Sequence, residues 1–436
     1  MEATTPEGPD PDLEAQMILL AASQHNLETL RTLLRTGSAN VQDPETGYTP
    51  LHAAIAACAP EDGTSAANGE AHTNGYLSGY LNGEATNGDV EAVEGDEGME
   101  IVKKTLKLLL QNGAIWNDLD KKNETPGCIA WRSGLKELYE IMVDAGVRAE
   151  MLLNRLDGYE PLVDDGDEED EEEEREVEDT GTTDGEAQRH TGGIVPEILP
   201  AEEARTAPIE DETKADVNSA DYLQSDLTYL DDRLLDEDKN GVMMAWETGI
   251  MKRTADLLLP HEDLRVLNIG HGMGIIDNFF QSRSPTSHHI VEAHPTVLAD
   301  MKRNGWYDKS GVTIHEGKWQ DVLPKLIEEG TMFNAIYFDT FAEEYKALRD
   351  FFNEYVIGLL DEGGKWGFFN GLGADRQVCY DVYTKVVEMD LFEAGFDTEW
   401  ETLDVPDLEK NEEWKGVRRR YWTLEKYKLP ICTFIG

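Results

Sequence analysis

The stretch LRVLNIGHGMGIIDNFFQ (264–281) constrains the fold more than any other part of this sequence. Its apolar first residues suit a buried strand, and the hydrophobic period after the glycines is that of a helix. Gly270, Gly272 and Gly274 let the backbone turn tightly and approach a ligand, while the helix N-terminus offers free N–H groups. Ile275 stands where a dinucleotide fingerprint needs its third glycine, so the turn indicates only a general nucleotide-type site.

Two further apolar stretches predict neighbouring strands of the same sheet. HHIVEAH (288–294) carries Glu292 about twenty residues after the glycines, where an acid can bind ribose hydroxyls. VTIHEGKWQDV (312–322) brings Lys318 and Trp319 to the same rim, and an indole suits packing against adenine. Ligands of open α/β sheets bind at the carboxyl ends of the strands, so we expect these side chains to converge. The alternatives are a surface carboxylate for Glu292 and a core indole for Trp319.

An acidic residue ends a fourth apolar stretch, FNAIYFDTF (333–341). A carboxylate at the tip of a buried strand must be paired, capped or used, because desolvating it unpaired is costly. After this residue, Asp339, the pattern predicts a helix over about 343–360 and a fifth strand within 362–371. A second acid, Glu247, lies upstream in VMMAWETGIM. The alternatives are helix capping for Asp339 and a surface position for Glu247.

Repeated phrases organise the first third of the chain. TLRTLLRTGSA (29–39) is echoed by TLKLLLQNGA (105–114), and GYTPLHAAIAA (47–57) by NETPGCIAWRS (123–133). The TPLH phrase is typical of ankyrin repeats, with two to three copies present, near the minimum for a stable stack. We therefore predict an ankyrin-repeat-like domain over 1–155 with a low-complexity insert at 59–98. Such a stack either binds proteins or braces the neighbouring domain.

Charge and composition narrow the classes of partner. The 89 acidic against 38 basic side chains give a net charge of −51, which repels nucleic-acid phosphates and attracts basic proteins. Much of that charge lies in an acidic stretch over 156–215, which we predict to be a disordered linker. The four cysteines are scattered, which favours a reducing compartment and argues against structural zinc. Neither a signal peptide nor a membrane span is evident, so we predict a soluble protein without membrane contact.

The motifs resemble those of the guanidinoacetate N-methyltransferase family. The resemblance lies in the glycine turn GHGMGI, Glu292, EGKWQDV, IYFDTF, LLDEGGKWGFFNG and VMMAWETGIM. With its ankyrin-like front end, the chain resembles the fungal protein arginine N-methyltransferase 2 family, which joins such repeats to this type of catalytic domain. The resemblance implies an α/β class I methyltransferase fold, Rossmann-like with a seven-stranded sheet, over 216–436. It also implies S-adenosyl-L-methionine as the cofactor.

Site residues follow from the same resemblance, position by position. It implies that Asp339 and Glu247 are catalytic. It implies that the cofactor contacts Tyr222, Met251, Gly270, His271, Gly272, Met273, Gly274, Ile275, Ile276, Glu292, Ala293, His294, Lys318, Trp319 and Asp339. Tyr229 is the alternative to Tyr222 on the flap before the core. Asn268 departs from the pattern, because many methyltransferases place an acid before the glycines.

The implied chemistry explains why two acids are needed. A guanidinium stays protonated near neutral pH, with a pKa above about 12, and has no free lone pair to attack a methyl group. Carboxylates can hold it in bidentate fashion and help a proton to leave. We expect Asp339 and Glu247 to hold it from two sides, with Asp339 the preferred proton acceptor and no metal ion required.

Three functions remain open at this stage. The favoured one is an arginine N-methyltransferase acting on a basic protein, and the resemblance implies the internal δ-nitrogen and a ribosomal protein as substrate. The second is a small-molecule guanidino methyltransferase, which needs a cation for the substrate carboxylate; GVRRRYW (416–422) has arginines, but we expect them on the exposed side of a late strand. The third is a non-catalytic ankyrin adaptor with a methyltransferase fold. We expect a cytoplasmic monomer, with nuclear entry left open.

Overall fold

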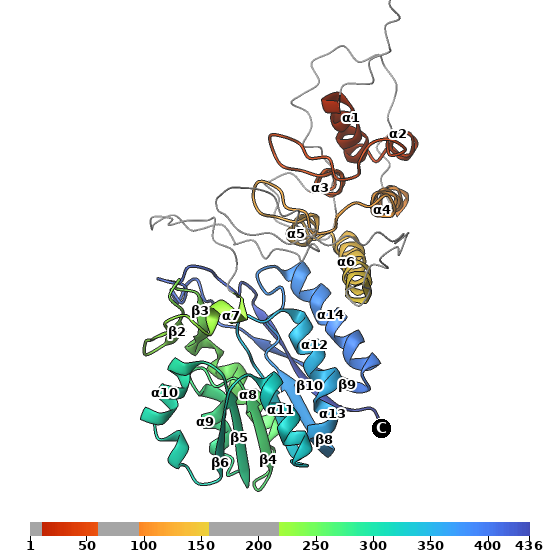
Figure 1. Cartoon of the computed structure of the whole chain (residues 1–436). Helices are drawn as coiled ribbons and strands as arrows, with labels where there is room; N and C mark the ends of the chain where they lie inside the picture. Colours follow the sequence, from red (N-terminus) through yellow and green to blue (C-terminus); the bar gives the residue numbers. More distant parts are fainter. Residues whose placement is uncertain (1–10, 60–95, 157–217) are drawn as a thin grey trace, which may run out of the picture.

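The structure is a computed structural model that describes residues 11–59, 96–156 and 218–436 (Figure 1). Most of the predicted insert at 59–98 and of the predicted linker at 156–215 lie outside the described residues. The described residues form a helical region (11–156) followed by an α/β region (218–436). Within them, no helix combines the length and the apolar character that crossing a bilayer requires.

The helical region consists of helices that pack against one another around a shared apolar core. Its described helices are α1 (Pro11–Ser23), α2 (Leu27–Leu33), α3 (Pro50–Ala56), α4 (Asp96–Gln111), α5 (Pro126–Arg132) and α6 (Lys136–Leu156). Helices α3 and α5 both begin at a proline that follows a threonine, Thr49 or Thr125, as the TPLH and TPGC phrases suggest. The ring of His52 bonds to the carbonyl of Glu124 at 3.0 Å and so joins the two phrases. The ankyrin assignment itself stays a prediction.

A seven-stranded sheet forms the centre of the α/β region, with the order β6-β5-β4-β7-β8-β10-β9. The strands are β4 (Arg265–Ile269), β5 (Ser287–Glu292), β6 (Val312–Glu316), β7 (Phe333–Phe338), β8 (Leu360–Phe368), β9 (Phe396–Asp404) and β10 (Lys426–Phe434). Strand β10 runs antiparallel to β8 and β9, whereas the other neighbours pair in parallel. The predicted seven-stranded sheet is confirmed.

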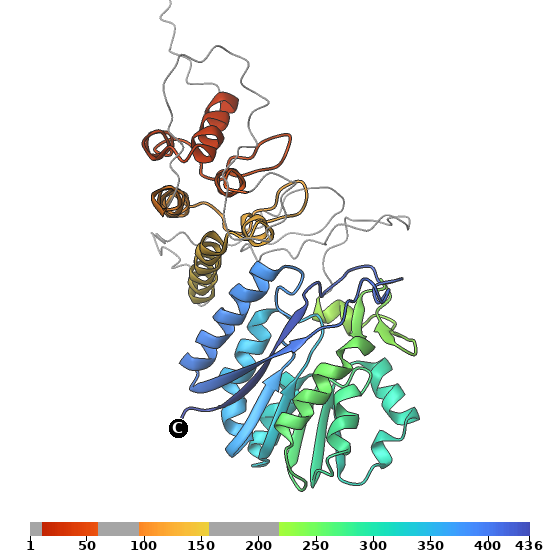
Figure 2. The ribbon, with the colours of Figure 1, turned by 180° about the vertical axis from the view of Figure 1, so that it is seen from behind.

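Helices cover both faces of this sheet (Figures 1 and 2). Alternate residues of the strands supply two cores: Val266 of β4 packs on one face and Leu267 on the other. The first face carries α8 (Thr248–Leu258), α9 (Ile275–Gln281) and α10 (Pro295–Arg303). The second carries α11 (Trp319–Glu328), α12 (Tyr345–Glu354), α13 (Val356–Leu359) and α14 (Gln377–Glu393). The helix predicted over 343–360 is therefore divided into α12 and α13.

Five short elements of the described chain precede the first helix of the α/β core: α7 (Ser219–Tyr222), β1 (Thr228–Tyr229), β2 (Arg233–Leu235), β3 (Gly241–Met244) and η1 (Ala245–Glu247). A further short helix, η2 (Trp306–Asp308), lies between α10 and β6. β1, β2 and β3 form a small antiparallel sheet. Residues 405–425, here called the crossover loop, connect β9 to β10. The prediction that the arginines at 418–420 belong to a strand is wrong, because this loop has no strand pairing and Arg420 instead bonds Glu409.

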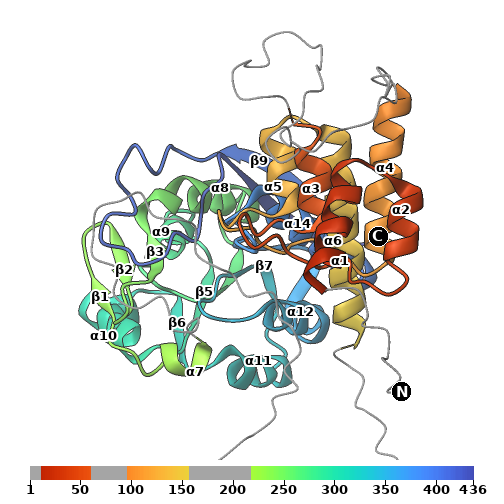
Figure 3. The same cartoon turned by 90° about the horizontal axis from the view of Figure 1, so that it is seen from above.

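The helical region packs against α14, as the view from above shows (Figure 3). Val378, Val382 and Val386 of α14 are at most 1% exposed and belong to the same apolar core as the helices of the N-terminal region. The contact is close, since a Cβ added to Gly127 of α5 or Gly146 of α6 would lie 2.6 Å from one of these valines. The two regions therefore share one continuous core.

Candidate active site

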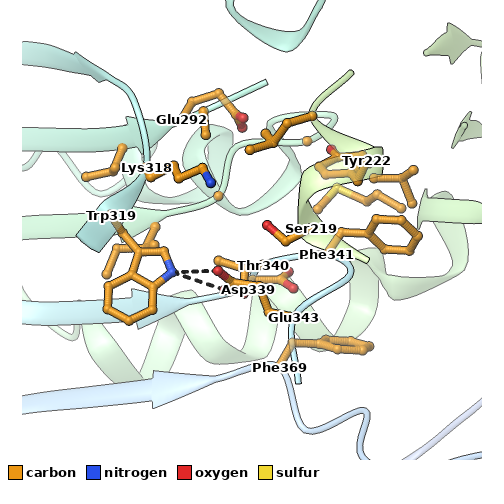
Figure 4. Close-up of a pocket in the computed structure, with 18 of the residues that line it drawn as sticks. Ser219, Tyr222, Glu292, Lys318, Trp319, Asp339, Thr340, Phe341, Glu343 and Phe369 are labelled. Atoms are coloured by element: carbon orange, nitrogen blue, oxygen red, sulfur yellow. Dashed lines mark hydrogen bonds between the residues drawn. The ribbon is translucent and has the colours of Figure 1, made fainter. Parts of the chain in front are cut away.

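A cavity of about 220 Å³ opens at the carboxyl ends of β4, β5 and β7 (Figure 4). Parallel strands present these ends at one edge of the sheet, which is where open α/β sheets bind ligands. The predicted site residues that line it are Tyr222, Glu247, Gly270, Gly272, Glu292, Ala293, Lys318, Trp319 and Asp339. Residues far apart in the sequence thus meet at one place, as the topology predicts.

The floor of the cavity depends on Gly270. Its φ is +92°, and a Cβ at this position would lie 1.8 Å from the backbone oxygen of Asp339. The backbone N–H of Asp339 also donates to the carbonyl of Ile269 at 2.9 Å. The ends of β4 and β7 therefore touch through their backbones, and a side chain at position 270 would push them apart.

Glu292 is buried at the end of β5 and is held by backbone donors. The N–H of His271 donates to its Oε2 at 2.9 Å, and the N–H of His294 donates to its Oε1 at 2.7 Å. These bonds fix the carboxylate beside the glycine turn. Each oxygen keeps a second lone pair, which is free to accept from a hydroxyl in the cavity.

The flap before the core reaches the cavity through Tyr222. Its ring packs against His294 and Phe341 at centroid distances of 4.8 and 5.0 Å, and its carbonyl accepts from Nε2 of His294 at 3.0 Å. Tyr229, the alternative, does not line the cavity; its hydroxyl donates to the carbonyl of Gly272 at 3.0 Å. Of the two tyrosines, the structure places Tyr222 in contact with the cavity.

Trp319 belongs both to the core and to the cavity wall. Its indole packs edge-on against Phe338 and Phe351, while the residue also borders the cavity. The indole N–H donates to both oxygens of Glu343 at 3.0 Å, drawn as dashed lines in Figure 4. The hydroxyl of Thr340 donates to the same carboxylate at 2.6 Å. Trp319 is therefore a core residue, as the alternative held, and it also borders the cavity, as a role in binding adenine requires.

Two acids face the cavity with strongly perturbed pKa values. Burial and repulsion from Asp339 raise the pKa of Glu247 to about 8, although hydrogen bonds from Tyr421 and the N–H of Met244 oppose the shift. Burial and the negative charge of Asp277 raise the pKa of Asp339 to about 7. The Oδ2 atom of Asp339 is buried without a hydrogen-bond partner among the described residues. Such a pair requires a cation between its members before both carboxylates ionise readily.

A buried polar network supports the glycine turn from below. Asp277 of α9 accepts from Nδ1 of His271 at 2.6 Å, from Nε2 of His288 at 2.8 Å and from the amide of Asn268 at 2.9 Å. Burial alone raises the pKa of Asp277, but His271 and His288 outweigh it and lower the pKa to about 2. Asn268 also donates to the carbonyl of Gly270 at 2.8 Å. The amide of Asn268 thus links the turn to an acid located on the following helix.

Comparisons with known proteins found a matching family model and similar full-length relatives. A family model described as guanidinoacetate N-methyltransferase matches residues 212–431. "Protein arginine N-methyltransferase 2" of Emericella nidulans is 56% identical over 433 residues, covering 98% of both chains. The protein of the same name from Neurospora crassa is 47% identical and covers 97% of this chain and 96% of that relative. The chain belongs to the protein arginine N-methyltransferase 2 family.

Membership in the protein arginine N-methyltransferase 2 family confirms the recognition made from the motifs. The predicted fold, a class I S-adenosylmethionine-dependent methyltransferase, and the predicted cofactor are those of this family. The residues present fit the cofactor: Gly270 leaves backbone exposed on the cavity floor, Glu292 has oxygens left for hydroxyls, and Trp319 offers an apolar wall. Their individual contacts with the cofactor stay predictions.

Several residues that the family resemblance assigned to the cofactor do not line the cavity. They are Met251, His271, Met273, Gly274, Ile275, Ile276 and His294. Met251 and Ile276 are buried in the core on the α8 face, and His294 caps α10. The N–H groups of His271 and Met273 donate to Glu292 and to the sulfur of Met243. Direct contacts of these seven residues with the cofactor stay predictions.

Sequence reasoning missed several residues of the cavity. Met243, Glu343, Phe369 and Tyr421 line it. Met243 and Phe369 lie inside the motifs VMMAWETGIM and LLDEGGKWGFFNG, and Glu343 follows IYFDTF by two residues, so proximity in the sequence was an available signal. Tyr421 comes from the crossover loop, whose sequence has no periodicity that indicates its destination.

Proposed function

We propose that this protein transfers a methyl group from S-adenosylmethionine to the internal δ-nitrogen of an arginine in a basic protein substrate. The observation that carries the proposal is a pair of acids, the buried Glu247 and the half-buried Asp339, which face one cavity beside the glycine turn. Both acids have raised pKa values, so a cation is the ligand that this pair is suited to bind.

A guanidinium matches the two acids in charge and in shape. Its planar fork presents N–H groups in pairs, and each carboxylate can accept one pair. Binding of the cation stabilises both ionised acids and lowers their pKa values, because opposite charges favour the charged form. The partnerless Oδ2 of Asp339 then gains the hydrogen bond that it lacks among the described residues.

The reaction needs a proton acceptor and a fixed line of attack. S-adenosylmethionine, when bound, supplies a sulfonium methyl whose carbon–sulfur bond breaks with the electron pair left on sulfur. Asp339 takes the proton from the attacking nitrogen, and the freed pair forms the new nitrogen–carbon bond. Asp339 then releases that proton to solvent, so the methylated guanidinium leaves as a cation. Glu247 keeps the group oriented, and such positioning is the main source of rate in a displacement of this kind.

The cavity lining supports an arginine side chain over a free guanidino acid. Among the described residues that line the cavity, Lys318 is the sole cationic side chain, and it lies at the start of α11 beside Trp319. The arginines at 418–420 do not line the cavity, so they offer no partner there for a substrate carboxylate. The net charge of −51 favours a basic partner, and we propose a ribosomal protein on the resemblance stated above.

One experiment tests the proposal directly. The purified chain is incubated with labelled S-adenosylmethionine and either ribosomal protein extract or guanidinoacetate, and products are located by mass spectrometry. We expect label in protein and a methyl group on the δ-nitrogen. Label in guanidinoacetate alone would support the small-molecule alternative, and a terminal-nitrogen product would overturn the δ assignment. Label in neither would support the adaptor alternative.

A further inference from the structure

One residue of the crossover loop (405–425), Tyr421, lines the cavity next to Glu247. The hydroxyl of Tyr421 donates to Oε1 of Glu247, and the N–H of Met244 donates to the same oxygen at 3.1 Å. The hydrogen bonds that the structure shows to Glu247 therefore converge on Oε1. The second oxygen, Oε2, is left for a ligand.

Tyr421 is itself held in place by packing on both sides. Its ring lies 5.0 Å from Trp414 and 5.9 Å from Trp246, measured between centroids. A Cβ on Gly241 would lie 3.0 Å from its ring, so the neighbouring strand β3 passes close to it. The ring packed in this way directs its hydroxyl at Glu247.

The residues that follow Tyr421 attach the loop to the body of the domain. Trp422 is fully buried, and its ring lies 5.3 Å from that of Tyr380. The N–H and hydroxyl of Thr423 donate to the carbonyls of Ala374 at 3.0 Å and Asp375 at 2.8 Å. The end of the loop that carries Tyr421 is therefore anchored to the domain beside the cavity.

We propose that Tyr421 is a positioning residue for methyl transfer, whose hydroxyl orients Glu247 so that Oε2 faces the substrate guanidinium. This inference rests on the proposed function. A hydrogen bond to a carboxylate favours its ionised form, so Tyr421 also keeps Glu247 charged in the substrate complex. Asp339 has no such donor on Oδ2 among the described residues, so the lone pairs of that oxygen are available to accept the proton of the guanidinium. The two acids thus have different roles: Glu247, oriented by Tyr421, holds the guanidinium, and Asp339 accepts its proton.

In the part of the chain that the structure describes, no basic side chain contributes to the pKa shift of Glu247. The titratable groups that influence it, or are influenced by it, are Asp339, Tyr337, Tyr421 and Tyr427. Of these three tyrosines, Tyr421 alone has a hydrogen bond to Glu247 shown in the structure. Removing its hydroxyl leaves burial and repulsion from Asp339 unopposed by a side chain, which raises the pKa of Glu247 further.

The test uses Tyr421→Phe in the full-length protein, because this change removes the hydroxyl and keeps the ring. We expect kcat/KM for an arginine substrate to fall roughly 10–100-fold, the range for a hydrogen bond to a charged group. The acidic limb of its pH profile should move to higher pH. Tyr380→Phe is the matched control, since it removes a buried hydroxyl beside Trp422 that has no bond to Glu247. It should leave the pH profile in place.

A double-mutant cycle separates positioning from a general loss of structure. In a Glu247→Gln background, Tyr421→Phe should have less than a threefold further effect, because the charged partner is already gone. Losses that multiply, or an unchanged pH profile in Tyr421→Phe, would overturn the proposal. If Tyr421→Phe does not fold, 3-fluorotyrosine at position 421 replaces it. Its more acidic hydroxyl should shift the acidic limb to lower pH, and an unmoved limb would overturn the proposal equally.

A readout without methyl transfer completes the test. Thermal unfolding of the cofactor-free protein is followed from pH 5 to 9, and the fall in stability with rising pH should be steeper for Tyr421→Phe than for Tyr380→Phe. Equal slopes would count against the inference. This measurement remains informative even if the wild-type protein methylates no arginine, so failure of the proposed function and failure of the Tyr421 inference are distinguishable.

Discussion

The hydroxyl of Tyr139 on α6 donates a 2.6 Å hydrogen bond to Asp381 on α14, across the junction of the helical and α/β regions. Lys428 of β10 donates to the other oxygen of Asp381 at 2.9 Å. This bond lies beside the shared apolar core, so the helical region is attached to the catalytic sheet by both polar and apolar contacts. The bracing role considered for the ankyrin-like region therefore has a physical basis.

Removing residues 1–156 should destabilise the α/β region. The deletion exposes Val378, Val382 and Val386, and each buried aliphatic side chain contributes about 1.5–3 kcal/mol. We expect a lower Tm and aggregation, measured by calorimetry and light scattering. Replacing the three valines by serine in the truncated chain should restore solubility. The activity of the rescued chain is then measured on an intact protein substrate and on a short arginine peptide. A loss of activity on the intact protein alone would show that the helical region also captures substrate. A truncated chain with native Tm would contradict the bracing role.

Gly270→Ala should disrupt the cavity floor. The added Cβ meets the backbone oxygen of Asp339 and is placed at a positive φ, so the ends of β4 and β7 must separate. We expect both a lower Tm and cofactor binding weakened at least tenfold, measured by calorimetry. Gly249→Ala is the matched control, because no atom lies within 4 Å of its added Cβ in α8. It should be neutral or stabilise by about 0.5–1 kcal/mol.

Asp339→Asn should abolish proton acceptance while keeping the shape of the site. We expect the methylation rate to fall at least about a hundredfold, with cofactor affinity nearly unchanged. Glu247→Gln should act in the same direction. The double variant should be worse by less than the product of the two losses, because both acids hold one group. Wild-type turnover in Asp339→Asn would refute the mechanism.

Glu247→Gln should also stabilise the cofactor-free protein at alkaline pH. The raised pKa of Glu247 means that the folded state holds a proton which the unfolded state releases, between about pH 4.5 and pH 8. Stability of the wild type therefore falls as pH rises through this window. We expect the variant to gain roughly 2–4 kcal/mol at pH 9 and much less at pH 5, measured by denaturant unfolding. A gain independent of pH would show that Glu247 is ionised throughout this range.

Glu292→Gln should weaken the cofactor more than its small change of shape suggests. Both oxygens of Glu292 accept from backbone N–H groups, of His271 and His294, so an amide NH2 must face one of these donors. The expected loss is about 1–3 kcal/mol of binding free energy, measured by calorimetry. A change in substrate KM alone, with cofactor affinity retained, would assign Glu292 to the substrate instead.

The local sequence was sufficient to predict the central strands and the acidic residues at their carboxyl ends. The run from Leu264 to Gln281 changes period at the glycines, and Asp339 follows an apolar stretch too dense for a surface strand. Parallel strands end at one edge of a sheet, so Gly270, Glu292 and Asp339 could be expected to meet before their contacts were known. The boundaries of β4, β5 and β7 follow the predicted stretches.

The tertiary structure alone decided what surrounds these residues. Tyr421 bonds Glu247 across 174 positions of the chain, from a loop without periodicity whose path depends on where Trp422 is buried. The valines of α14 likewise look like ordinary core residues, and only the fold shows that the helical region covers them. The hydrophobic period of a sequence indicates which side of a helix or strand is buried, but it does not indicate which other element packs against that side. The partner is decided by packing between distant segments, which local sequence does not encode.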